Sequence, residues 1–189
     1  MSLRIVHYND RVLRKKGERV TVFDHALKDL VREMIATMHE AGGIGLAAQQ
    51  IGHPLQLCVV DLRDAESPFT WMINGARPPL ELFMPMVLVN PVITPTPGVP
   101  ATTGEEGCLS FPGIRGPVPR QEGLTVKFED ENGIPHTLEC DGLLARCILH
   151  EADHLNGVLF VDHLDKTARA SVEEAIKALA RETQAAAEA

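Results

Sequence analysis

The stretch His150-Glu151-Ala152-Asp153-His154 constrains the fold of this chain more than any other feature of the sequence. Side chains four residues apart lie on the same face of an α-helix, so His150 and His154 can offer two imidazole nitrogens to one metal ion. Glu151 lies about 100° around the helix from His150, where its carboxylate can reach a water molecule on the metal. This H-E-x-x-H pattern is typical of metal-dependent hydrolases, in which one helix carries two ligands and a general base.

The sequence around this motif predicts a largely buried helix. Asp141 is a candidate N-cap, and Asn156-Gly157 is a candidate stop signal. The apolar residues that recur between them at helical spacing are Leu143, Leu144, Cys147, Ile148 and Leu155. Two histidines and a glutamate on such a helix lose hydration free energy unless they gain polar partners, and a metal ion is a partner for all three. The context therefore favours a metal centre over two histidines placed by chance on a surface helix.

Length and composition favour one catalytic domain that spans residues 1–189. The chain has 189 residues, of which 44% are hydrophobic, and this is enough for one sizeable core. The formal net charge of -8 argues against a surface that binds nucleic acid throughout, so we expect no specific nucleic-acid sequence as a partner.

The spacing of the cysteines and the lack of long apolar segments indicate where in the cell the protein is found. The four cysteines form no C-x-x-C pair, which is typical of proteins in a reducing environment. The segment before Val20 lacks the apolar stretch of a signal peptide, and nowhere do about eighteen apolar residues run together. We therefore expect a cytoplasmic protein without membrane association.

Periodicity and turn signals predict an α+β fold, with antiparallel β-sheets around the central metal-binding helix and with N-terminal and C-terminal helices. Apolar spacing and Gly42-Gly43 define the first helix, and Asn132-Gly133 is a strong hairpin signal. The expected elements are a helix at 24–41, strands at 55–62 and 86–92, and a hairpin that joins 124–130 to 134–140.

Two further segments have open roles. Residues 63–80 hold three prolines and the only tryptophan, so we expect a long loop, which is either a flap beside the site or a surface excursion without a role. Residues from about 165 to 189 predict an amphipathic C-terminal helix, whose tail from Gln184 we expect to fray.

A catalytic metal site of this kind needs a third protein ligand and an open position. The metzincin pattern fails, because Phe160 stands where its last histidine would be. Glu173 or Glu174 has the downstream spacing of a thermolysin-like endopeptidase, but both lie in a polar segment. Cys108 is the stronger candidate, since glycines flank it in the sequence and a thiol that binds a metal ion loses its proton and becomes a thiolate ligand. A noncatalytic metal-binding protein with a closed fourth position is the other alternative.

Three segments together resemble the motifs of bacterial-type peptide deformylases. They are GIGLAAQQ at 43–50, EGCLS at 106–110 and HEADHLNG at 150–157, and they occur in the order found in that family. The resemblance covers nearly the whole chain. It implies an α+β catalytic domain and a metal-dependent hydrolase that removes the N-formyl group from the N-terminal formylmethionine of newly synthesised polypeptides and releases formate.

The resemblance also assigns roles to residues of the site. It implies that Cys108, His150 and His154 hold one divalent transition metal; Fe2+ is favoured, and Zn2+, Ni2+ and Co2+ also suit these ligands. Hydroxide formed at the metal would attack the formyl carbon, with Glu151 as general base and then general acid. The oxyanion would be stabilised by the side-chain amide of Gln50 and the backbone N–H of Leu109. The residues expected to bind the substrate are Ile44, Gly45, Leu46, Glu106, Gly107, Arg115, Leu143 and Cys147.

By the same resemblance, the partners are nascent N-formylmethionyl peptides. The charged face of the C-terminal helix either contacts the ribosome, as the resemblance implies, or is only solvated. Three neighbouring positions are expected to have supporting roles. Arg120 should pair with Glu106 and brace the strand of Cys108, while Asp153 should be a hydrogen-bonding partner behind the ligands. We expect the stem of Arg146 to pack while its charged head reaches water. Gln49 stands where many family members have proline, which should affect the stiffness of the loop more than the chemistry.

Overall fold

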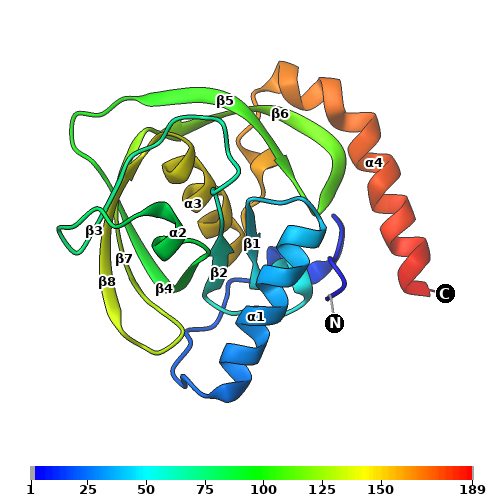
Figure 1. Cartoon of the computed structure of the whole chain (residues 1–189). Coiled ribbons are helices and arrows are strands. Elements are labelled where there is room, and N and C mark those ends of the chain that lie inside the picture. The colour runs from blue at the N-terminus through cyan, green and yellow to red at the C-terminus, as the bar shows by residue number, and fades with distance from the viewer. Residues whose placement is uncertain (1–2, 189) are drawn as a thin grey trace.

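Residues 3–188 are described by the structure, which is a computed structural model of the chain. A six-stranded antiparallel sheet forms the body of the fold, in the order β1-β2-β4-β7-β8-β3 (Figure 1). Its strands are β1 Gly45–Ala47, β2 Leu57–Val60, β3 Trp71–Ile73, β4 Met86–Pro95, β7 Gly123–Glu129 and β8 Pro135–Asp141. A separate antiparallel pair is formed by β5 Ala101–Cys108 and β6 Phe111–Gln121.

Within the described residues, four α-helices and three short 3-10 helices complete the fold. The α-helices are α1 His25–Glu40, α2 Leu80–Phe83, α3 Gly142–Leu155 and α4 Lys166–Glu188. The 3-10 helices are η1 Arg11–Arg14, η2 Ala48–Ile51 and η3 Phe160–Asp162. The predicted α+β class, with antiparallel sheets and helices at both ends, is confirmed. The expected strands at 55–62 and 86–92 correspond to β2 and to a longer β4.

Helix α1 begins and ends where the sequence predicts. The Asp24 carboxylate accepts a hydrogen bond from the backbone N–H of Leu27 at 3.0 Å, which satisfies one of the free donors of the first turn. The helix buries Val31, Met34 and Met38 in a core cluster against β1, β2 and the start of β4. These methionines are packing residues, and the helix covers the end of the sheet that carries β1.

The β7–β8 hairpin confirms the Asn-Gly signal. The Asp130 carboxylate accepts hydrogen bonds from the backbone N–H groups of Asn132 (2.8 Å) and Ile134 (2.9 Å), which closes the turn. Gly133 has φ +79°, a conformation that is strained for residues with a Cβ atom. The seven residue pairs of this hairpin fix its register over the whole length of both strands.

Helix α3 lies inside the curve of the strands (Figure 1) and packs against β1, β2, β6, β7 and β8. Its apolar side is buried in a core cluster with residues of β2, β4, β7 and β8. Asp141 occupies the N-cap position, but its carboxylate does not cap the helix. It accepts hydrogen bonds from the backbone N–H and the hydroxyl of Thr70, at 2.6 Å and 2.7 Å. The helix ends at Leu155, and Asn156 is its C-cap. The next residue, Gly157, has φ +73°, and a Cβ atom on it would lie 2.6 Å from the carbonyl oxygen of Arg14.

Helix α4 runs along the outside of the molecule beside β6 (Figure 1). Its side chains Ile176 and Leu179 are buried in a third core cluster with Leu13, Phe111 and Phe160. The helix continues to Glu188, and Ala189 lies outside the described residues; fraying of this tail stays a prediction. Across residues 3–188, no helix has the length and the apolar content to cross a membrane.

Candidate active site

Two elements that are far apart in the sequence bring three ligand residues together. Strand β5 ends at Cys108, where the register of its pairing with β6 shifts, and α3 presents His150 and His154 from one face. One ligand atom from each residue lies within 4.8 Å of the others, and Cys108 Sγ lies 3.2 Å from His154 Nε2. The predicted set of two imidazoles and one thiol is therefore assembled in space.

Glu106 fixes the orientation of His150. Its Oε2 lies 2.9 Å from His150 Nδ1, so the other ring nitrogen of His150 is left for a metal ion. Arg120 donates two hydrogen bonds to the same carboxylate, from Nε to Oε1 and from Nη2 to Oε2, both at 2.9 Å. Burial alone would raise the pKa of Glu106, but the hydrogen bonds with His150 and Arg120 lower it to about 2. Glu106 is thus a carboxylate at neutral pH, and the predicted Arg120–Glu106 pair is confirmed.

Arg120 also connects this pair to the far side of α3. Its Nη1 donates to Asp153 Oδ2 at 2.5 Å, and His163 Nε2 lies 2.7 Å from the same oxygen. Asp153 therefore serves as a hydrogen-bonding partner behind the ligands, as expected from the sequence.

Two buried polar atoms beside the cluster have no partner among the described residues: Glu151 Oε2 and His154 Nδ1. The Glu151 side chain is nearly inaccessible to solvent, and burial raises its pKa to about 7. An unpaired buried carboxyl is costly unless a bound group satisfies it. A thiol, two imidazoles and an unpaired carboxyl in one place form a donor set that fits a divalent transition metal with a water molecule.

The amide of Gln50 faces the same place. Its Oε1 accepts a hydrogen bond from the backbone N–H of Ala47 at 2.9 Å, which fixes the orientation of the amide. Its Nε2 consequently points to Cys108 Sγ (3.4 Å) and to Ser110 Oγ (3.3 Å). Gln50 can therefore donate a hydrogen bond to a group bound beside Cys108.

A cavity of about 730 Å³ opens over the cluster, a volume typical of small-ligand sites. Almost all of the predicted site residues line it: Ile44, Gly45, Gln50, Glu106, Gly107, Cys108, Leu109, Arg115, Leu143, Cys147, His150 and Glu151. His154 lies behind the wall of the cavity and is 1% exposed. Leu46 is not among the residues that line the cavity, because its fully buried side chain packs in the core cluster beneath α1, and its part in substrate binding stays a prediction.

The cavity also has residues that the sequence did not indicate. Phe111, Pro112 and Ile114 follow the Cys108 motif directly, so their proximity was a signal that could have been used. Ile5 and His7 line it because the N-terminal segment is held by a hydrogen bond from the Val6 N–H to the Gln50 carbonyl, a long-range contact without a local signal.

Gly45 lies where only glycine fits. A Cβ atom on this residue would lie 2.8 Å from Glu151 Cδ and 2.9 Å from Cys147 Sγ. The residue belongs to β1, whose other edge is free because β1 ends the six-stranded sheet. The absence of a side chain at Gly45 therefore lets the backbone of β1 approach the carboxyl of Glu151 closely.

Arg146 does not behave as expected. Its side chain is only 16% exposed at the edge of the cavity, and its guanidinium is held by hydrogen bonds to protein groups. Nη1 donates to Glu106 Oε1 at 3.0 Å and to the Val118 carbonyl at 2.9 Å, and Nη2 donates to the Thr102 carbonyl at 3.0 Å. The expectation that the head reaches water was wrong because β5 and β6 present backbone acceptors to this position.

Residues 63–80 are not a flap beside the site, since none of them lines the cavity. Strand β3 lies in this segment and pairs with β8, and Trp71 stacks on Phe83 with ring centroids 6.3 Å apart. The segment packs against the core cluster that α3 forms with β2, β4, β7 and β8, at the far end of the sheet from β1.

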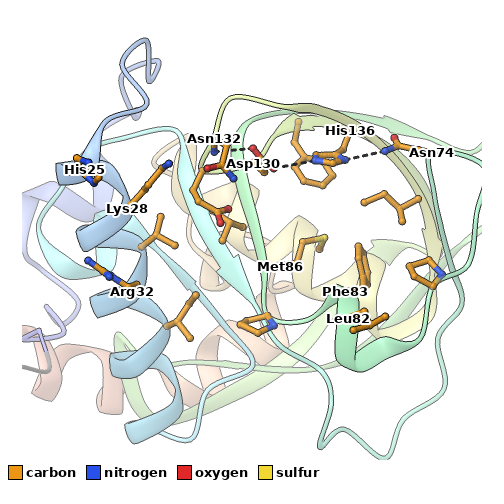
Figure 2. A pocket seen from close by; sticks show the side chains of 18 residues that line it. His25, Lys28, Arg32, Asn74, Leu82, Phe83, Met86, Asp130, Asn132 and His136 are labelled. Atoms are coloured by element: carbon orange, nitrogen blue, oxygen red, sulfur yellow. Dashed lines mark hydrogen bonds and ion pairs between the residues drawn. The ribbon is translucent and has the colours of Figure 1, made fainter.

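A second cavity of about 700 Å³ lies between α1, the β7–β8 hairpin and the segment around α2 (Figure 2). His25, Lys28 and Arg32 come from α1, and His136 lies between Asp130 (3.4 Å) and Asn74 (3.0 Å) on the other side. The residues that line this cavity include none of the ligand cluster, so the chemistry belongs to the first cavity.

The cysteines differ in accessibility. Cys58, Cys140 and Cys147 are buried, whereas Cys108 is partly exposed, and the described chain has no disulfide. Burial raises the pKa of the Cys140 thiol to about 12 and places the pKa values of Cys58 and Cys147 well above the ordinary value. Of the four cysteines, Cys108 is the one that lies with the two histidines in the ligand cluster.

Comparison with known proteins gives consistent relatives. The family model described as polypeptide deformylase matches residues 2–170. A peptide deformylase of Opitutus terrae is 64% identical over 187 residues, which cover 99% of this chain and 97% of the relative. The crystal structure of a peptide deformylase from Synechococcus elongatus in complex with actinonin has a TM-score of 0.78 and 43% identity, over 94% of this chain and 85% of that one. A plant peptide deformylase has a TM-score of 0.85 and 34% identity, over 99% and 94%.

The fold and the Cys-His-His cluster with its adjacent glutamate define a metal-dependent hydrolase. The thermolysin-like alternative does not fit, because Glu173 and Glu174 lie on α4 and form ion pairs with Arg169 and Lys177. With the family match over most of its length, the chain belongs to the peptide deformylase family. It is an enzyme, a hydrolase that removes the N-formyl group from peptides.

Proposed function

We propose that the natural substrates of this deformylase are nascent polypeptides with an N-terminal formylmethionine, and that the whole chain acts as one catalytic domain. The observation that supports this most is the position of Glu151, whose unpaired buried carboxyl faces the same cavity as the Cys108–His150–His154 cluster and Gln50. The cavity draws residues from segments between Ile5 and Glu151, so the site is assembled from parts of the chain that are far apart in the sequence.

We propose that Cys108, His150 and His154 hold one divalent transition metal, with Fe2+ favoured by the family resemblance. Such an ion supplies Lewis-acid chemistry, which polarises a carbonyl and makes water acidic enough to form hydroxide at neutral pH. The ligand set also suits Zn2+, Ni2+ and Co2+. Elemental analysis of protein purified without oxygen checks the assignment, and a preparation that keeps full activity after its transition metal has been removed would contradict it.

In this proposal, Glu151 moves the proton. It accepts the proton of the attacking water and later delivers it to the departing amine, so that the peptide leaves as a free amine and the formyl group leaves as formate. Its place next to His150 on α3 keeps the carboxyl beside the ligands without making it a ligand. Gly45 keeps the opposite side of Glu151 free of side-chain atoms.

The carbonyl oxygen of the formyl group becomes negatively charged when the water attacks. The Gln50 amide donates a hydrogen bond to this oxygen, because its own Oε1 is held by the Ala47 N–H. The backbone N–H of Leu109, directly after Cys108, provides a second donor in the same wall of the cavity. Donors of this kind each lower the barrier by about 3 kcal/mol.

The rest of the cavity binds the peptide. Ile44, Leu143 and Cys147 form the apolar wall for the methionine side chain. The free edge of β1 at Gly45 and the backbone at Gly107 pair with the extended peptide, as an added strand would. Arg115 lies at the rim, with its guanidinium beside Gly107, where it contacts the chain that follows the methionine.

Formate release from a short formylmethionyl peptide tests the proposal directly. We expect activity in the wild type after metal loading, and a loss of at least a thousandfold in Glu151→Ala and in Cys108→Ala. Glu131→Ala, at the turn of the β7–β8 hairpin, is a matched control that should retain full activity. If Cys108→Ala kept wild-type activity, the assigned ligand set would be wrong.

We also propose that the exposed face of α4 contacts the ribosome, since the substrate emerges there, and that the protein acts in the cytoplasm. Lys166, Lys177 and Arg181 are exposed on this helix. Removal of α4 would uncover the third core cluster, so reversal of these three charges to glutamate is the cleaner experiment. We expect reduced co-sedimentation with ribosomes at low salt, while the matched reversal of Lys15, Lys16 and Arg19 should leave it unchanged. If the α4 variant co-sedimented with ribosomes as strongly as the control variant and the wild type, α4 would be excluded as the contact.

A further inference from the structure

Arg146 joins the two elements that carry the metal ligands. It lies on α3, one turn before His150, and its guanidinium reaches across to the β5–β6 pair, which ends in Cys108. It donates to the backbone carbonyl of Thr102 on β5 at 3.0 Å and to that of Val118 on β6 at 2.9 Å. One cationic group thus fastens both strands to the helix.

Gly104 makes room for this guanidinium. A Cβ atom at position 104 would lie 3.0 Å from Arg146 Cζ and 3.1 Å from Nη2, so even alanine would press on the group. A small residue on β5 and a long cationic residue on α3 therefore fit each other, as two residues of complementary size do.

The third contact of Arg146 leads to the metal ligands. Its Nη1 donates to Glu106 Oε1 at 3.0 Å, the oxygen that also accepts from Arg120 Nε. The other oxygen, Oε2, contacts His150 Nδ1 at 2.9 Å. Because one carboxylate is rigid and planar, two arginines that hold Oε1 also fix the direction in which Oε2 meets the imidazole. Partners of this kind orient a ligand and strengthen metal binding.

We propose that Arg146 is a positioning residue for His150, which acts through Glu106, and that Gly104 and Arg146 work as a pair. The inference rests on the proposed role of Cys108, His150 and His154 as the metal site. Without Arg146, Glu106 keeps its pair with Arg120 but loses one of its anchors, and β5 loses a tie to α3. The metal ion should then leave the site faster, although the ligands themselves are unchanged.

The test measures the rate at which Co2+-loaded protein loses its metal to a chelator, followed by the absorption of the cobalt–thiolate group. We expect Arg146→Leu to lose the metal about tenfold faster than the wild type. Arg146→Lys, which keeps the charge but not the planar donor set, should lie between them. Arg19→Leu, which removes a surface arginine paired with Glu129, is the matched control and should not change the rate. A wild-type rate in Arg146→Leu overturns the proposal.

Gly104→Ala gives an independent test that keeps the arginine. We expect this variant to lose the metal faster than the wild type, because the added methyl displaces the guanidinium. In the Arg146→Leu background the same alanine should have no further effect, since the group it displaces is absent. Additive effects of the two substitutions would show that they act separately and would overturn the pairing.

Metal release and the thermal unfolding of each metal-free variant are independent of catalysis. A wild type without deformylase activity would contradict the proposed function and leave the release rates interpretable. A uniform fall in the unfolding temperature of Arg146→Leu, with a wild-type release rate, would assign Arg146 a role in stability alone and overturn the positioning role.

Discussion

At the scale of single residues, the site depends on groups whose surroundings are costly for the folded protein. Glu151 is buried with one oxygen unpaired, and Gly45 lies against it without a side chain of its own. A sequence that only favoured stability would pair or remove such a carboxyl. Buried groups of this kind are expected where a bound metal and a substrate complete the interactions.

The residues that carry the chemistry could be predicted, because they lie in short local motifs. The H-E-x-x-H motif can be interpreted from the helical spacing of its residues alone. Cys108 stands out because it directly follows Gly107 in a short segment that is rich in glycine. The contacts of Arg146 and the burial of Leu46 could not be predicted in the same way. Both depend on which backbone groups and core clusters the fold places opposite them, and this information is spread over β1, β5 and β6.

Gln50→Ala should lower kcat by about a hundredfold while KM changes little, because the amide donates to an oxygen that is charged only in the transition state. Steady-state formate release over a range of peptide concentrations measures both constants. Gln184→Ala, an exposed position near the end of α4, is the control. A rise in KM with unchanged kcat would show that Gln50 binds the substrate instead.

At the scale of helices and strands, the elements that could be predicted are those whose sequences carry strong turn, cap or periodicity signals. The β7–β8 hairpin and α1 have turn, cap and periodicity signals that agree with their tertiary contacts. Strand β6 has the sequence FPGIRGPVPRQ, in which three prolines and two glycines indicate a loop. It can still form a strand because it pairs on one side only, with β5. Proline has no backbone N–H, and this is tolerated at positions where the N–H would point away from the paired strand.

The link between α1 and β2 gives a pH-dependent prediction. Asp61 follows β2 and accepts hydrogen bonds from Arg63 and His39, the latter at the end of α1. Burial alone would raise the pKa of Asp61, but the Arg63 and His39 hydrogen bonds lower it. A carboxyl with a lowered folded-state pKa stabilises the fold above its unfolded pKa, and this stabilisation is lost as the pH falls through the folded value.

Asp61→Asn should therefore lower the free energy of unfolding by about 2 kcal/mol at pH 7, and by progressively less below about pH 4. Urea unfolding at several pH values measures the difference from the wild type. The exposed Glu66→Gln should show little change at any pH. A difference that is constant from pH 3 to pH 7 would mean that the ionised carboxyl is not the stabilising form.

At the scale of the whole molecule, the core consists of three clusters of buried side chains. One contains residues of α3, one lies beneath α1, and the third includes Ile176 and Leu179 of α4. This cluster joins η1 near the start of the chain to η3 and α4 near its end, with Phe111 of β6 between them. The C-terminal helix is therefore part of the fold as well as a candidate contact surface. Its amphipathic pattern predicted an apolar face but not the residues against which that face packs.

Ile176→Ala should lower the free energy of unfolding by about 3 kcal/mol, because its side chain is 2% exposed in the third cluster. Chemical denaturation measures the loss, and deformylation of a short peptide at 25 °C should change less than twofold because α4 does not line the active-site cavity. Glu182→Ala, on the exposed side of the same helix, should be nearly neutral. A large fall in peptide activity for folded Ile176→Ala would connect α4 to the site itself.

The unequal accessibility of the four cysteines allows metal occupancy to be counted without a metal analysis. Cys108 is the partly exposed thiol, and Cys58, Cys140 and Cys147 are buried. A thiol reagent should therefore modify one cysteine per chain quickly and the other three only after unfolding. A bound metal ion should remove the fast reaction, so the fraction of chains with a fast thiol equals the fraction without metal.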